Sequence, residues 1–306
     1  MIISWIILIV GFVLLVRGAD AFVDGAVGVA RRFHIPAIVI GTTLVAIGTS
    51  APEAAISITA ALKGSDGVSI GNVIGSNITN ILLILGVTAL IGAPRIGKRT
   101  KYLELPFVGI VTIVMCLMGL WFGGISRISA VVLLGLFVAF LGYMTVVAYK
   151  SKDKPENLTI MPISETIVVI IAGIAALIVG ANMITESATD IARYFGVSER
   201  VIGLTLIAFG TSLPELVVCI VAALKHEYDM AVGNIVGSNI FNILFVLGIA
   251  AVIRPLPFNE AFLTDGAIAL GAVTMLMIFV AKKSKLSRIG GILFLATYAA
   301  YVLYLF

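Results

Sequence analysis

The chain has 306 residues, of which 60% are hydrophobic and only 12% are charged, and its formal net charge is +4. Soluble domains usually carry about a quarter of their residues as charges. The composition therefore excludes a soluble globular domain, a disordered chain and a nucleic-acid-binding protein, and it indicates an integral membrane protein. The two cysteines, Cys116 and Cys219, lie inside apolar runs, where free buried thiols are expected.

Ten apolar segments are long enough to cross a bilayer, which needs about 20 residues for each helix. They run near 2–23, 37–62, 68–92, 104–123, 127–149, 164–186, 200–224, 230–253, 261–281 and 288–306. No basic residues precede the first segment, so we expect a retained span and not a cleaved signal peptide. The predicted protein is an all-α integral membrane protein.

The connecting loops differ in their content of basic residues. Loops after odd-numbered segments hold fourteen of the 20 Lys and Arg residues, whereas loops after even-numbered segments hold five. Because cytoplasmic loops are enriched in Lys and Arg, this count predicts that both termini lie outside, in the plasma (cytoplasmic) membrane.

An internal duplication covers the chain. Segment 41–53 recurs at 203–215, an offset of 162 residues, with nine of thirteen positions identical, and 71–80 recurs at 233–242 with the same offset. Each unit, 1–150 and 151–306, holds five spans, and an odd number of spans inverts the second unit in the membrane. We therefore expect ten transmembrane helices as two inverted five-helix repeats, with broken helices 2, 3, 7 and 8, as in many secondary transporters.

The first repeated segment predicts a helix break beside a carboxylate. Pro52 has no N–H group, so we expect the helix to break near Gly48 and Thr49 and to free the carbonyl oxygens of residues 46–49. These oxygens and the Ser50 hydroxyl attract a cation, while Glu53 lies in the first turn of the next helix. Thr211, Ser212, Pro214 and Glu215 repeat this arrangement from the other side of the membrane.

Helix capping is the structural alternative for these residues. Ser50 with Glu53, and Ser212 with Glu215, match the spacing of a capping box. A carboxylate in the membrane costs about 2.5–3.5 kcal/mol on insertion scales, and a cap contributes only about 1 kcal/mol. Capping alone therefore does not account for two intramembrane glutamates.

The second repeated segment supplies neutral oxygens. Asn72, Ser76 and Asn80 lie within about 80° on one helix face, and Asn234, Ser238 and Asn242 do the same. We expect the Ser76/Asn80 and Ser238/Asn242 faces to coordinate an ion, whereas Asn77 and Asn239 point elsewhere and are expected to join helices. Gly71/Gly75 and Gly233/Gly237 predict close helix approach.

Together these residues predict a site of hard oxygens. Calcium takes 6–8 oxygens, and bidentate Glu53 and Glu215 with the carbonyls of Thr49 and Thr211 already supply six. The two histidines, His34 and His226, fall in expected loops, which argues against zinc, copper or iron as the transported ion. Magnesium is disfavoured more weakly, because it sheds water reluctantly.

The paired Gly-Thr-Ser-x-Pro-Glu and Gly-Asn-x-x-Gly-Ser-Asn segments resemble the alpha repeats of the sodium/calcium exchanger family, within the calcium/cation antiporter superfamily. The resemblance covers essentially the whole chain and implies antiport of calcium against monovalent cations through an inverted ten-helix bundle. The ion ligands that it implies are Ala46, Thr49, Ser50, Glu53, Ser76, Asn80, Ala208, Thr211, Ser212, Glu215, Ser238 and Asn242.

This chain departs from the family pattern at the second repeat. Asn242 stands where many sodium/calcium exchangers have an aspartate, so the site has two carboxylates, which two monovalent ions balance and three do not. The departure puts the usual stoichiometry in doubt and keeps protons open as the driving ion. Against protons, Gly75 and Gly237 stand where cation/proton exchangers of the superfamily typically have glutamate.

The leading hypothesis is a secondary antiporter that moves Ca²⁺ outward in exchange for Na⁺, with spans 1 and 6 sliding past a rigid core. The alternative is an H⁺/Ca²⁺ exchanger in which the same two glutamates are protonated. A cation channel and an intramembrane enzyme are remote, since neither a filter ring nor a nucleophile–base pair is recognisable. We expect no cofactor, and as partners only Ca²⁺, Na⁺ or H⁺, and the lipid bilayer, without nucleic acid or a protein partner.

Charged residues also gather at the expected ends of spans 1 and 6. Arg17, Asp20 and Asp24 close the first span, and Glu186, the repeat partner of Asp24, closes the sixth with Asp190. We expect an interfacial ion-pair cluster with a snorkelling Arg17, and the functional alternative is a vestibule or gate contact.

Overall fold

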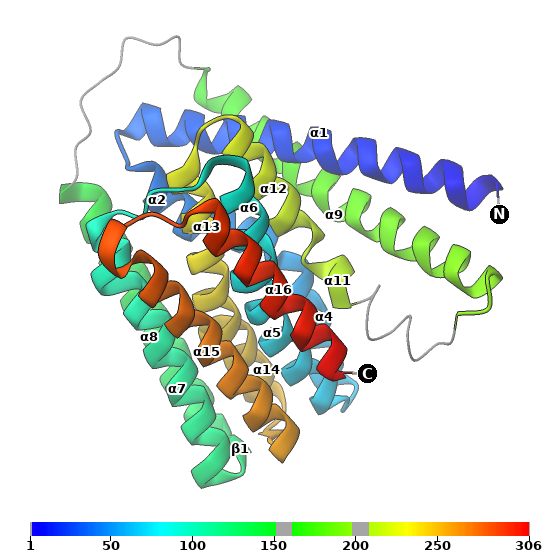
Figure 1. The fold of residues 1–306 in the computed structure, drawn as a ribbon, viewed down its shortest axis with the longest axis vertical. Coiled ribbons are helices and arrows are strands. Elements are labelled where there is room, and N and C mark those ends of the chain that lie inside the picture. The colour runs from blue at the N-terminus through cyan, green and yellow to red at the C-terminus, as the bar shows by residue number, and fades with distance from the viewer. Residues whose placement is uncertain (1, 151–160, 198–207, 306) are drawn as a thin grey trace.

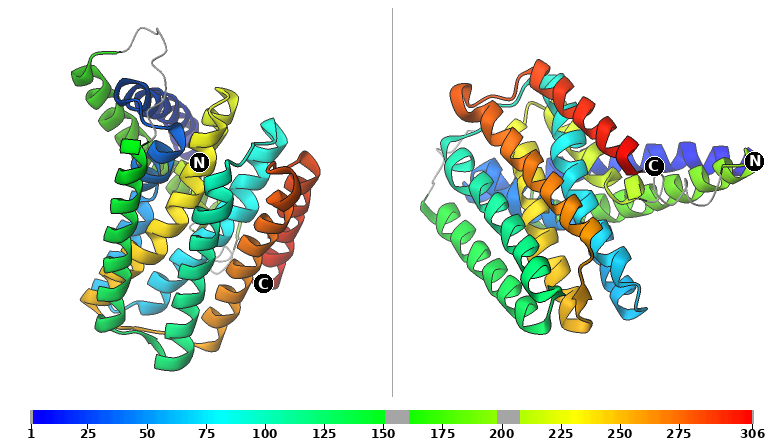
Figure 2. Two further views of the ribbon diagram at one scale, coloured as in Figure 1. Left: turned by 90° about the vertical axis from the view of Figure 1, so that its left-hand side faces the viewer. Right: turned by 60° about the horizontal axis from the view of Figure 1, so that its bottom comes forward.

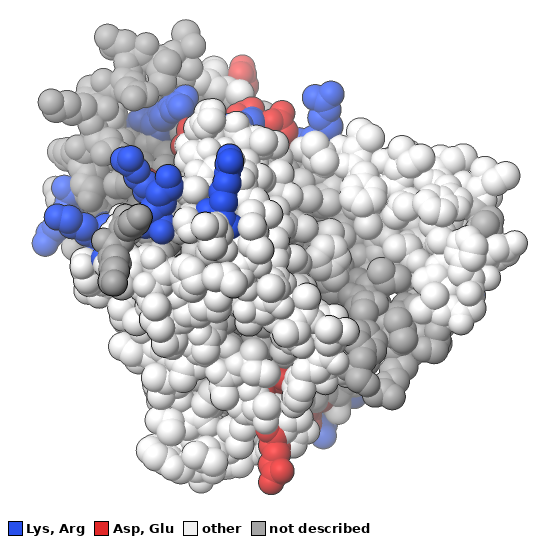
Figure 3. All heavy atoms as spheres, viewed as in Figure 1, with Lys and Arg blue, Asp and Glu red and all other residues white. Residues whose placement is uncertain are grey.

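The computed structural model describes residues 2–150, 161–197 and 208–305. Eight helices in these ranges are long and apolar enough to span a membrane, and the bent pair 37–49 and 51–63 makes a ninth. Charged atoms gather at the ends of the molecule and leave a broad uncharged band between them (Figure 3). The chain is therefore a multi-pass integral membrane protein, as its composition predicts.

The first repeat contains five spans, in which η denotes a π-helical turn. Its elements are α1 (Ile2–Phe33), α2 (Ala37–Ile40), η1 (Gly41–Val45), α3 (Ala46–Thr49), α4 (Ala51–Leu62), α5 (Asp66–Thr79), η2 (Asn80–Ile84), α6 (Leu85–Gly92), η3 (Thr100–Glu104), α7 (Leu105–Phe122), the short strand β1 (Gly124–Ile125) and α8 (Arg127–Lys150).

The second repeat follows the same order. Its elements are α9 (Ile163–Tyr194), α11 (Ala208–Thr211), α12 (Leu213–Leu224), α13 (Tyr228–Phe241), η5 (Asn242–Val246), α14 (Leu247–Ile253), the strand β2 (Leu256–Pro257), α15 (Glu260–Lys283) and α16 (Arg288–Leu305). The first part of the predicted seventh span, residues 200–207, lies outside the described residues. The other nine predicted spans are each represented by helix in the expected place.

Spans 1 and 6 are longer than predicted. Their sequence-based ends at 23 and 186 are wrong, because α1 continues to Phe33 and α9 to Tyr194. The acidic residues in these segments do not interrupt a helix; they lie along it. Each helix is instead followed by a residue in the left-handed region, His34 (φ 54°) and Gly196 (φ 78°), which are repeat partners at the offset of 162.

The helix breaks differ between the two kinds of repeated segment. Span 2 is broken as expected and bends by 48° between α3 and α4. The breaks predicted in spans 3 and 8 are not observed, since both helices run on through a π-helical turn that begins at Asn80 or Asn242. Neither segment contains a proline that would remove a backbone donor, so a widened turn replaces a break.

Helices α1 and α9 form an antiparallel pair that projects from the rest of the bundle (Figures 1 and 2). A Cβ added at Gly11 would lie 3.1 Å from the Gly180 carbonyl oxygen, and one at Gly18 would lie 3.0 Å from that of Gly173. These glycines are repeat partners (11 with 173, 18 with 180), so the two helices cross about an approximate two-fold axis. Their close backbone approach is typical of packing between membrane helices.

Spans 3 and 8 occupy the centre of the molecule. In the most apolar 18-residue stretch of each span, 72% of residues are buried in span 3 and 83% in span 8, whereas 22% are buried in α1. A Cβ at Gly233 would meet the Ile38 carbonyl oxygen at 2.6 Å, and the predicted close approach at Gly233/Gly237 is thus confirmed. By the repeat, the segment that approaches Gly71 and Gly75 is expected near residues 200–208, which lie mostly outside the described residues. This arrangement sets the broken helix of one repeat directly against the central helix of the other.

Each end of the bundle has its own set of basic residues and its own contacts between loops. The basic end carries Arg31, Arg95, Lys101, Lys225 and Lys285, and Lys101 donates there to the Ala281 carbonyl oxygen. The opposite end carries Lys63, Arg127 and Arg254, and strands β1 and β2 pair there. The unequal Lys and Arg count of the loops therefore corresponds to two physical ends of the bundle.

Candidate cation site

The break in span 2 lies at Ser50, between α3 and α4. Ser50 has φ −83° and ψ 10°, and Pro52 follows at the start of α4, where the missing N–H leaves the Gly48 carbonyl without its usual helical donor. The Ala46 carbonyl, however, still accepts the Ser50 amide at 3.0 Å, so the expected release of residues 46–49 does not extend to Ala46. Ser212 repeats this geometry before Pro214, with φ −88° and ψ 3°.

The two glutamates are brought together from opposite repeats. Glu53 and Glu215 lie in the first turns of α4 and α12, and their exposed fractions are 1% and 0%. The Ser50 hydroxyl donates to Glu215 Oε1 at 2.8 Å, across the interface between the repeats. The two carboxylates are close enough to interact electrostatically. The acids thus face a shared buried region and not the lipid.

The capping alternative is wrong for both serines. Neither Ser50 nor Ser212 makes a side-chain hydrogen bond to the N-terminus of the helix that follows it. Ser50 instead bonds the glutamate of the other repeat. Ser212 likewise lies beside Glu53 of the other repeat, although its Oγ forms no hydrogen bond of ordinary length among the described residues. The serines therefore point into the region that the glutamates share.

Four asparagines form a hydrogen-bonded network between the central helices. Asn77 Nδ2 donates to the Asn239 carbonyl at 3.2 Å, and Asn239 Nδ2 donates back to the Asn77 carbonyl at 3.4 Å. Asn80 Nδ2 donates to Asn239 Oδ1 at 3.0 Å, and Asn242 Nδ2 donates to Asn77 Oδ1 at 3.2 Å. Asn77 and Asn239 join the helices as expected, and they also orient the amides of Asn80 and Asn242.

Six buried oxygen atoms near the two breaks lack a hydrogen-bond partner within the described part of the chain. They are Glu53 Oε2, Glu215 Oε2, Asn80 Oδ1, Asn242 Oδ1, Ser212 Oγ and Ser238 Oγ. A buried polar group without a partner costs roughly 1–3 kcal/mol, so six in one region require an explanation. Six hard oxygens match the coordination that Ca²⁺ prefers.

The remaining candidate residues lie in the same region with different contacts. Thr49 Oγ1 donates to Asn234 Oδ1 at 3.0 Å, and the backbone carbonyl of Thr49 remains its predicted ligand atom. Ser76 is buried with an exposed fraction of 4% and Thr211 with 7%, and Ala208 begins α11. Asn72 lies outside the group, because its Nδ2 donates to the Glu53 carbonyl at 3.1 Å and holds α5 against α4.

A cavity of about 840 Å³ leads from the opposite end of the molecule to the breaks. Its lining includes Lys63, which follows α4, together with Glu186 and Arg193 of α9, and it also includes Pro52 and Thr211 beside the two breaks. The cavity therefore offers ions a path to the candidate site from this end.

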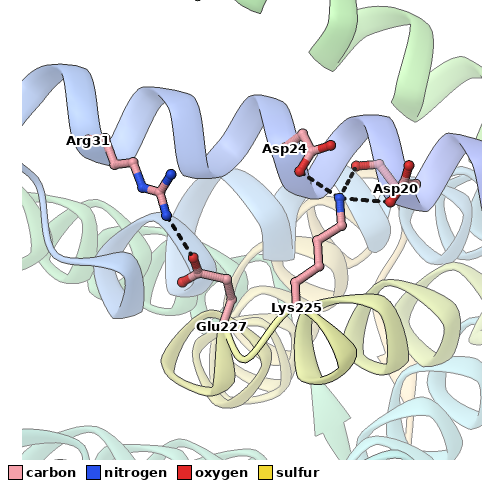
Figure 4. Close-up of polar contacts among 5 residues, drawn as sticks. All are labelled: Asp20, Asp24, Arg31, Lys225 and Glu227. Atoms are coloured by element: carbon pink, nitrogen blue, oxygen red, sulfur yellow. Dashed lines mark hydrogen bonds and ion pairs between the residues drawn. The ribbon is translucent and has the colours of Figure 1, made fainter. Parts of the chain in front are cut away.

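At the basic end, α1 is held against the core by ion pairs (Figure 4). Lys225 Nζ lies 2.7 Å from Asp20 Oδ1 and 2.5 Å from Asp24 Oδ1, and Arg31 lies 3.4 Å from Glu227. Burial disfavours the Lys225 ammonium, but the two aspartates outweigh it and raise the pKa of Lys225. The predicted ion-pair cluster exists, with Lys225 and not Arg17 as its cation. Sequence reasoning missed Lys225 because it is 201 residues from Asp24.

Comparison with known proteins gives consistent results. The family model described as "Sodium/calcium exchanger protein" matches residues 3–146 and 165–306. The sodium/calcium exchanger MaX1 of Methanosarcina acetivorans is 32% identical over 99% of this chain and 99% of that protein. The inner membrane protein YrbG of Escherichia coli is 40% identical over 83% of this chain and 81% of that protein. A structure of the sodium-calcium exchanger NCX_Mj soaked with 2.5 mM Na⁺ and 10 mM Sr²⁺ has a TM-score of 0.88, with 36% identity over 99% of this chain and 98% of that chain.

Proposed function

Since the chain belongs to the sodium/calcium exchanger family, and is thus a calcium/cation antiporter and not an enzyme, we propose that it exchanges Ca²⁺ for Na⁺ by alternating access. Ca²⁺ leaves the cell and Na⁺ enters, through a plasma-membrane protein with both termini outside. The exchange takes place at the buried site between the two repeats.

The proposed ligands come symmetrically from the two broken helices and the two central helices. They are Ala46, Thr49, Ser50, Glu53, Ser76, Asn80, Ala208, Thr211, Ser212, Glu215, Ser238 and Asn242. Ala46, Thr49, Ala208 and Thr211 would contribute backbone carbonyl oxygens, and the others contribute side-chain oxygens. The Ala46 carbonyl already accepts the Ser50 amide, so it would bind the ion through its second lone pair. The observation that carries this assignment is the set of six buried oxygens without partners.

The charge of the site couples the two ions. Glu53 and Glu215 together carry two negative charges, which one Ca²⁺ or two Na⁺ ions neutralise. An empty site would bury two carboxylates without a counter-charge, and such an arrangement is strongly unfavourable in a low dielectric. The access change therefore occurs with an ion bound, and each passage of Ca²⁺ requires a return passage of monovalent ions.

Sodium is favoured over the proton as the counter-ion by the central helices. Gly75 and Gly237 occupy the positions at which cation/proton exchangers of the superfamily typically carry glutamate, and a glycine has no proton to exchange. MaX1, which is similar over the whole chain, is named a sodium/calcium exchanger. The proton alternative would use the same two glutamates, protonated in turn, and it is decided by transport measurements.

The decisive experiment uses purified protein in proteoliposomes. Vesicles loaded with Na⁺ and diluted into Na⁺-free buffer with radioactive Ca²⁺ should accumulate the label. Vesicles loaded with choline at equal pH, and vesicles with only a pH gradient, should not. Uptake driven equally well by the pH gradient would reassign the counter-ion to H⁺, and uptake without any counter-ion gradient would indicate a channel.

A further inference from the structure

In the described part of the chain, ion pairs between the α1–α9 pair and the core are found at the basic end, whereas a cavity lies beside α9 at the opposite end. At the basic end, Lys225 bonds Asp20 and Asp24, and we call these three residues the Lys225 cluster. These side chains come from α1 and from the residue that follows α12, as Figure 4 shows. The cluster therefore joins the projecting helix pair to the helix that carries Glu215.

The inverted repeat places equivalent charges at the other end. Lys63 is the repeat partner of Lys225, and Glu186 is the repeat partner of Asp24, each at the offset of 162 residues. That register holds in this helix pair, because Gly11 and Gly18 meet the backbone at the repeat partners Gly180 and Gly173. Lys63 follows α4, which carries Glu53, as Lys225 follows α12.

The equivalent pair is open in this structure. Lys63 and Glu186 both line the 840 Å³ cavity at the opposite end. Neither forms an ion pair with any residue in the described ranges, although Asp190, one turn beyond Glu186, lies 3.8 Å from Arg193. The same charges are thus joined where the bundle is closed and separated where it is open.

Starting from alternating access, as in the proposed function, an inverted repeat requires that the two repeats exchange their conformations between the access states. The contact that Lys225 makes in one state is then available to Lys63 in the other. We propose that the Lys225 cluster and the Lys63–Glu186 pair are alternating latches, each closed in one access state and broken in the other.

The two latches differ in strength. The repeat partner of Asp20 is Asn182, so Lys63 has one matching carboxylate where Lys225 has two. The repeat partner of Glu227, which pairs with Arg31, is Ser65, which cannot form an ion pair. The basic end is therefore held more firmly, which favours the state that is open at the opposite end.

Cysteine accessibility tests the latches independently of transport. In a background of Cys116→Ala and Cys219→Ala, the reporter Ala55→Cys lies in the cavity, and its repeat partner Val217→Cys lies partly buried in α12 toward the basic end. The rate of maleimide labelling in detergent measures how often each end is open. Radioactive Ca²⁺ exchange by the background protein in liposomes tests the proposed function separately.

Weakening the strong latch should open the basic end. Lys225→Gln should raise labelling of Val217→Cys about two- to five-fold, the change expected for partly exposed ion pairs, and lower that of Ala55→Cys. Lys225→Arg keeps the charge and should label as the background does. Asn182→Asp restores the missing acid of the weak latch, leaves Lys225 intact, and should shift both reporters in the same direction as Lys225→Gln.

Removing the weak latch is the matched control. Lys63→Gln should not raise labelling at position 217, because it destabilises the state in which that position is open. Labelling rates in Lys225→Gln and Asn182→Asp that equal those of the background would overturn the latches, whether or not the protein exchanges Ca²⁺. Absence of exchange by the background with the predicted labelling shifts would instead contradict the proposed function.

Discussion

Two carboxylates carry the negative charge of the candidate site. Glu53 and Glu215 are almost fully buried, and each lies beside a helix break of its own repeat. If only one of the two carboxylates remained, one positive charge of a bound divalent ion would be left without a partner. The energetic consequence of losing either acid is therefore larger than the loss of one ligand oxygen.

Glu53→Gln and Glu215→Gln should each abolish Ca²⁺ exchange. Removing one partner of a buried charge pair costs about 3–5 kcal/mol, which corresponds to a loss of Ca²⁺ affinity of about two to almost four orders of magnitude. The measurement is Na⁺-driven uptake of radioactive Ca²⁺ in proteoliposomes with equal amounts of folded protein. Near-normal uptake by either variant would remove that glutamate from the ligand set.

Asn242→Asp should change the Na⁺ dependence of exchange. The substitution adds a third carboxylate at a buried position whose Oδ1 atom has no partner among the described residues. A third negative charge is balanced by three Na⁺ ions and not by two, so the Hill slope for Na⁺ should rise above that of the parent protein. An unchanged slope would contradict the charge-balance argument. Asn234→Asp is unsuitable as a control, because the Asn234 side chain accepts a hydrogen bond from Thr49.

Asn77→Ala should weaken Ca²⁺ binding without removing a ligand. Asn77 donates to the Asn239 carbonyl and accepts from Asn242 Nδ2, so it fixes the direction of the Asn242 oxygen. The two lost hydrogen bonds contribute about 1 kcal/mol each, and the Ca²⁺ concentration for half-maximal exchange should rise by up to about thirtyfold. Thr79→Val, which removes only a hydroxyl contact to Tyr298, is the control and should leave this concentration unchanged. Equal values for both variants would show that Asn77 does not position the site.

At the scale of elements, the site depends on how closely α13 packs against the broken helix of the first repeat. A Cβ added at Gly237 would lie 2.3 Å from the Thr42 carbonyl oxygen and 2.7 Å from Ala46 Cβ. Backbone atoms cannot move aside as the end of a flexible side chain can. The glycine is thus required by the close approach that brings Ser238 and Asn242 to the break.

Gly237→Ala should therefore destabilise the protein. Overpacking of this kind costs about 1–3 kcal/mol, and we expect a lower midpoint of thermal unfolding in detergent together with weaker Ca²⁺ binding. Gly135→Ala is the matched control, since an added Cβ at Gly135 in α8 meets nothing within 4 Å, and alanine is the better helix former. A midpoint for Gly237→Ala at or above that of the control would contradict the packing argument.

Local patterns predicted most elements correctly, and long-range contacts account for the errors. Apolar length gave the spans, and Pro52 gave the break in span 2, because both effects act within a few residues. The π-helical turns at Asn80 and Asn242 carry no local signal. The charges of Asp20 and Asp24 predict the end of the first span, but α1 continues to Phe33, and their partner Lys225 is distant in sequence.

The candidate site was predictable to the level of residues but not of atoms. On a helix Asn77 lies only about 60° from Asn80, so spacing does not separate a joining amide from a candidate ligand. The prediction that Asn77 points elsewhere is wrong, because Asn77 and Asn80 belong to one hydrogen-bonded network. Which atom of each amide is left free depends on the other repeat, through Asn239 and Asn242. For the same reason, sequence alone could not separate a capping serine from Ser50, whose partner is Glu215.

At the scale of the whole molecule, the two ends of the bundle differ in their basic residues, which bears on how the protein is oriented in the membrane. In the sequence, loops after odd-numbered spans hold fourteen Lys and Arg residues and loops after even-numbered spans hold five. Most of the visible basic atoms lie over one end in Figure 3. Cytoplasmic loops are enriched in Lys and Arg. The cavity, which opens at the opposite end, would then face the outside of the cell.

Cysteine labelling of intact cells should confirm this orientation. In the background without Cys116 and Cys219, Glu260→Cys at the opposite end should react with a membrane-impermeant maleimide added to whole cells. Lys98→Cys at the basic end, which is exposed to a similar degree, should react only after the membrane is permeabilised. The reverse pattern would place the cavity in the cytoplasm, and the strong latch at the basic end would then favour the inward-open state. The latches depend on the repeat and not on the orientation. That result would therefore change the side from which ions enter, but it would not affect the alternation between the two latches.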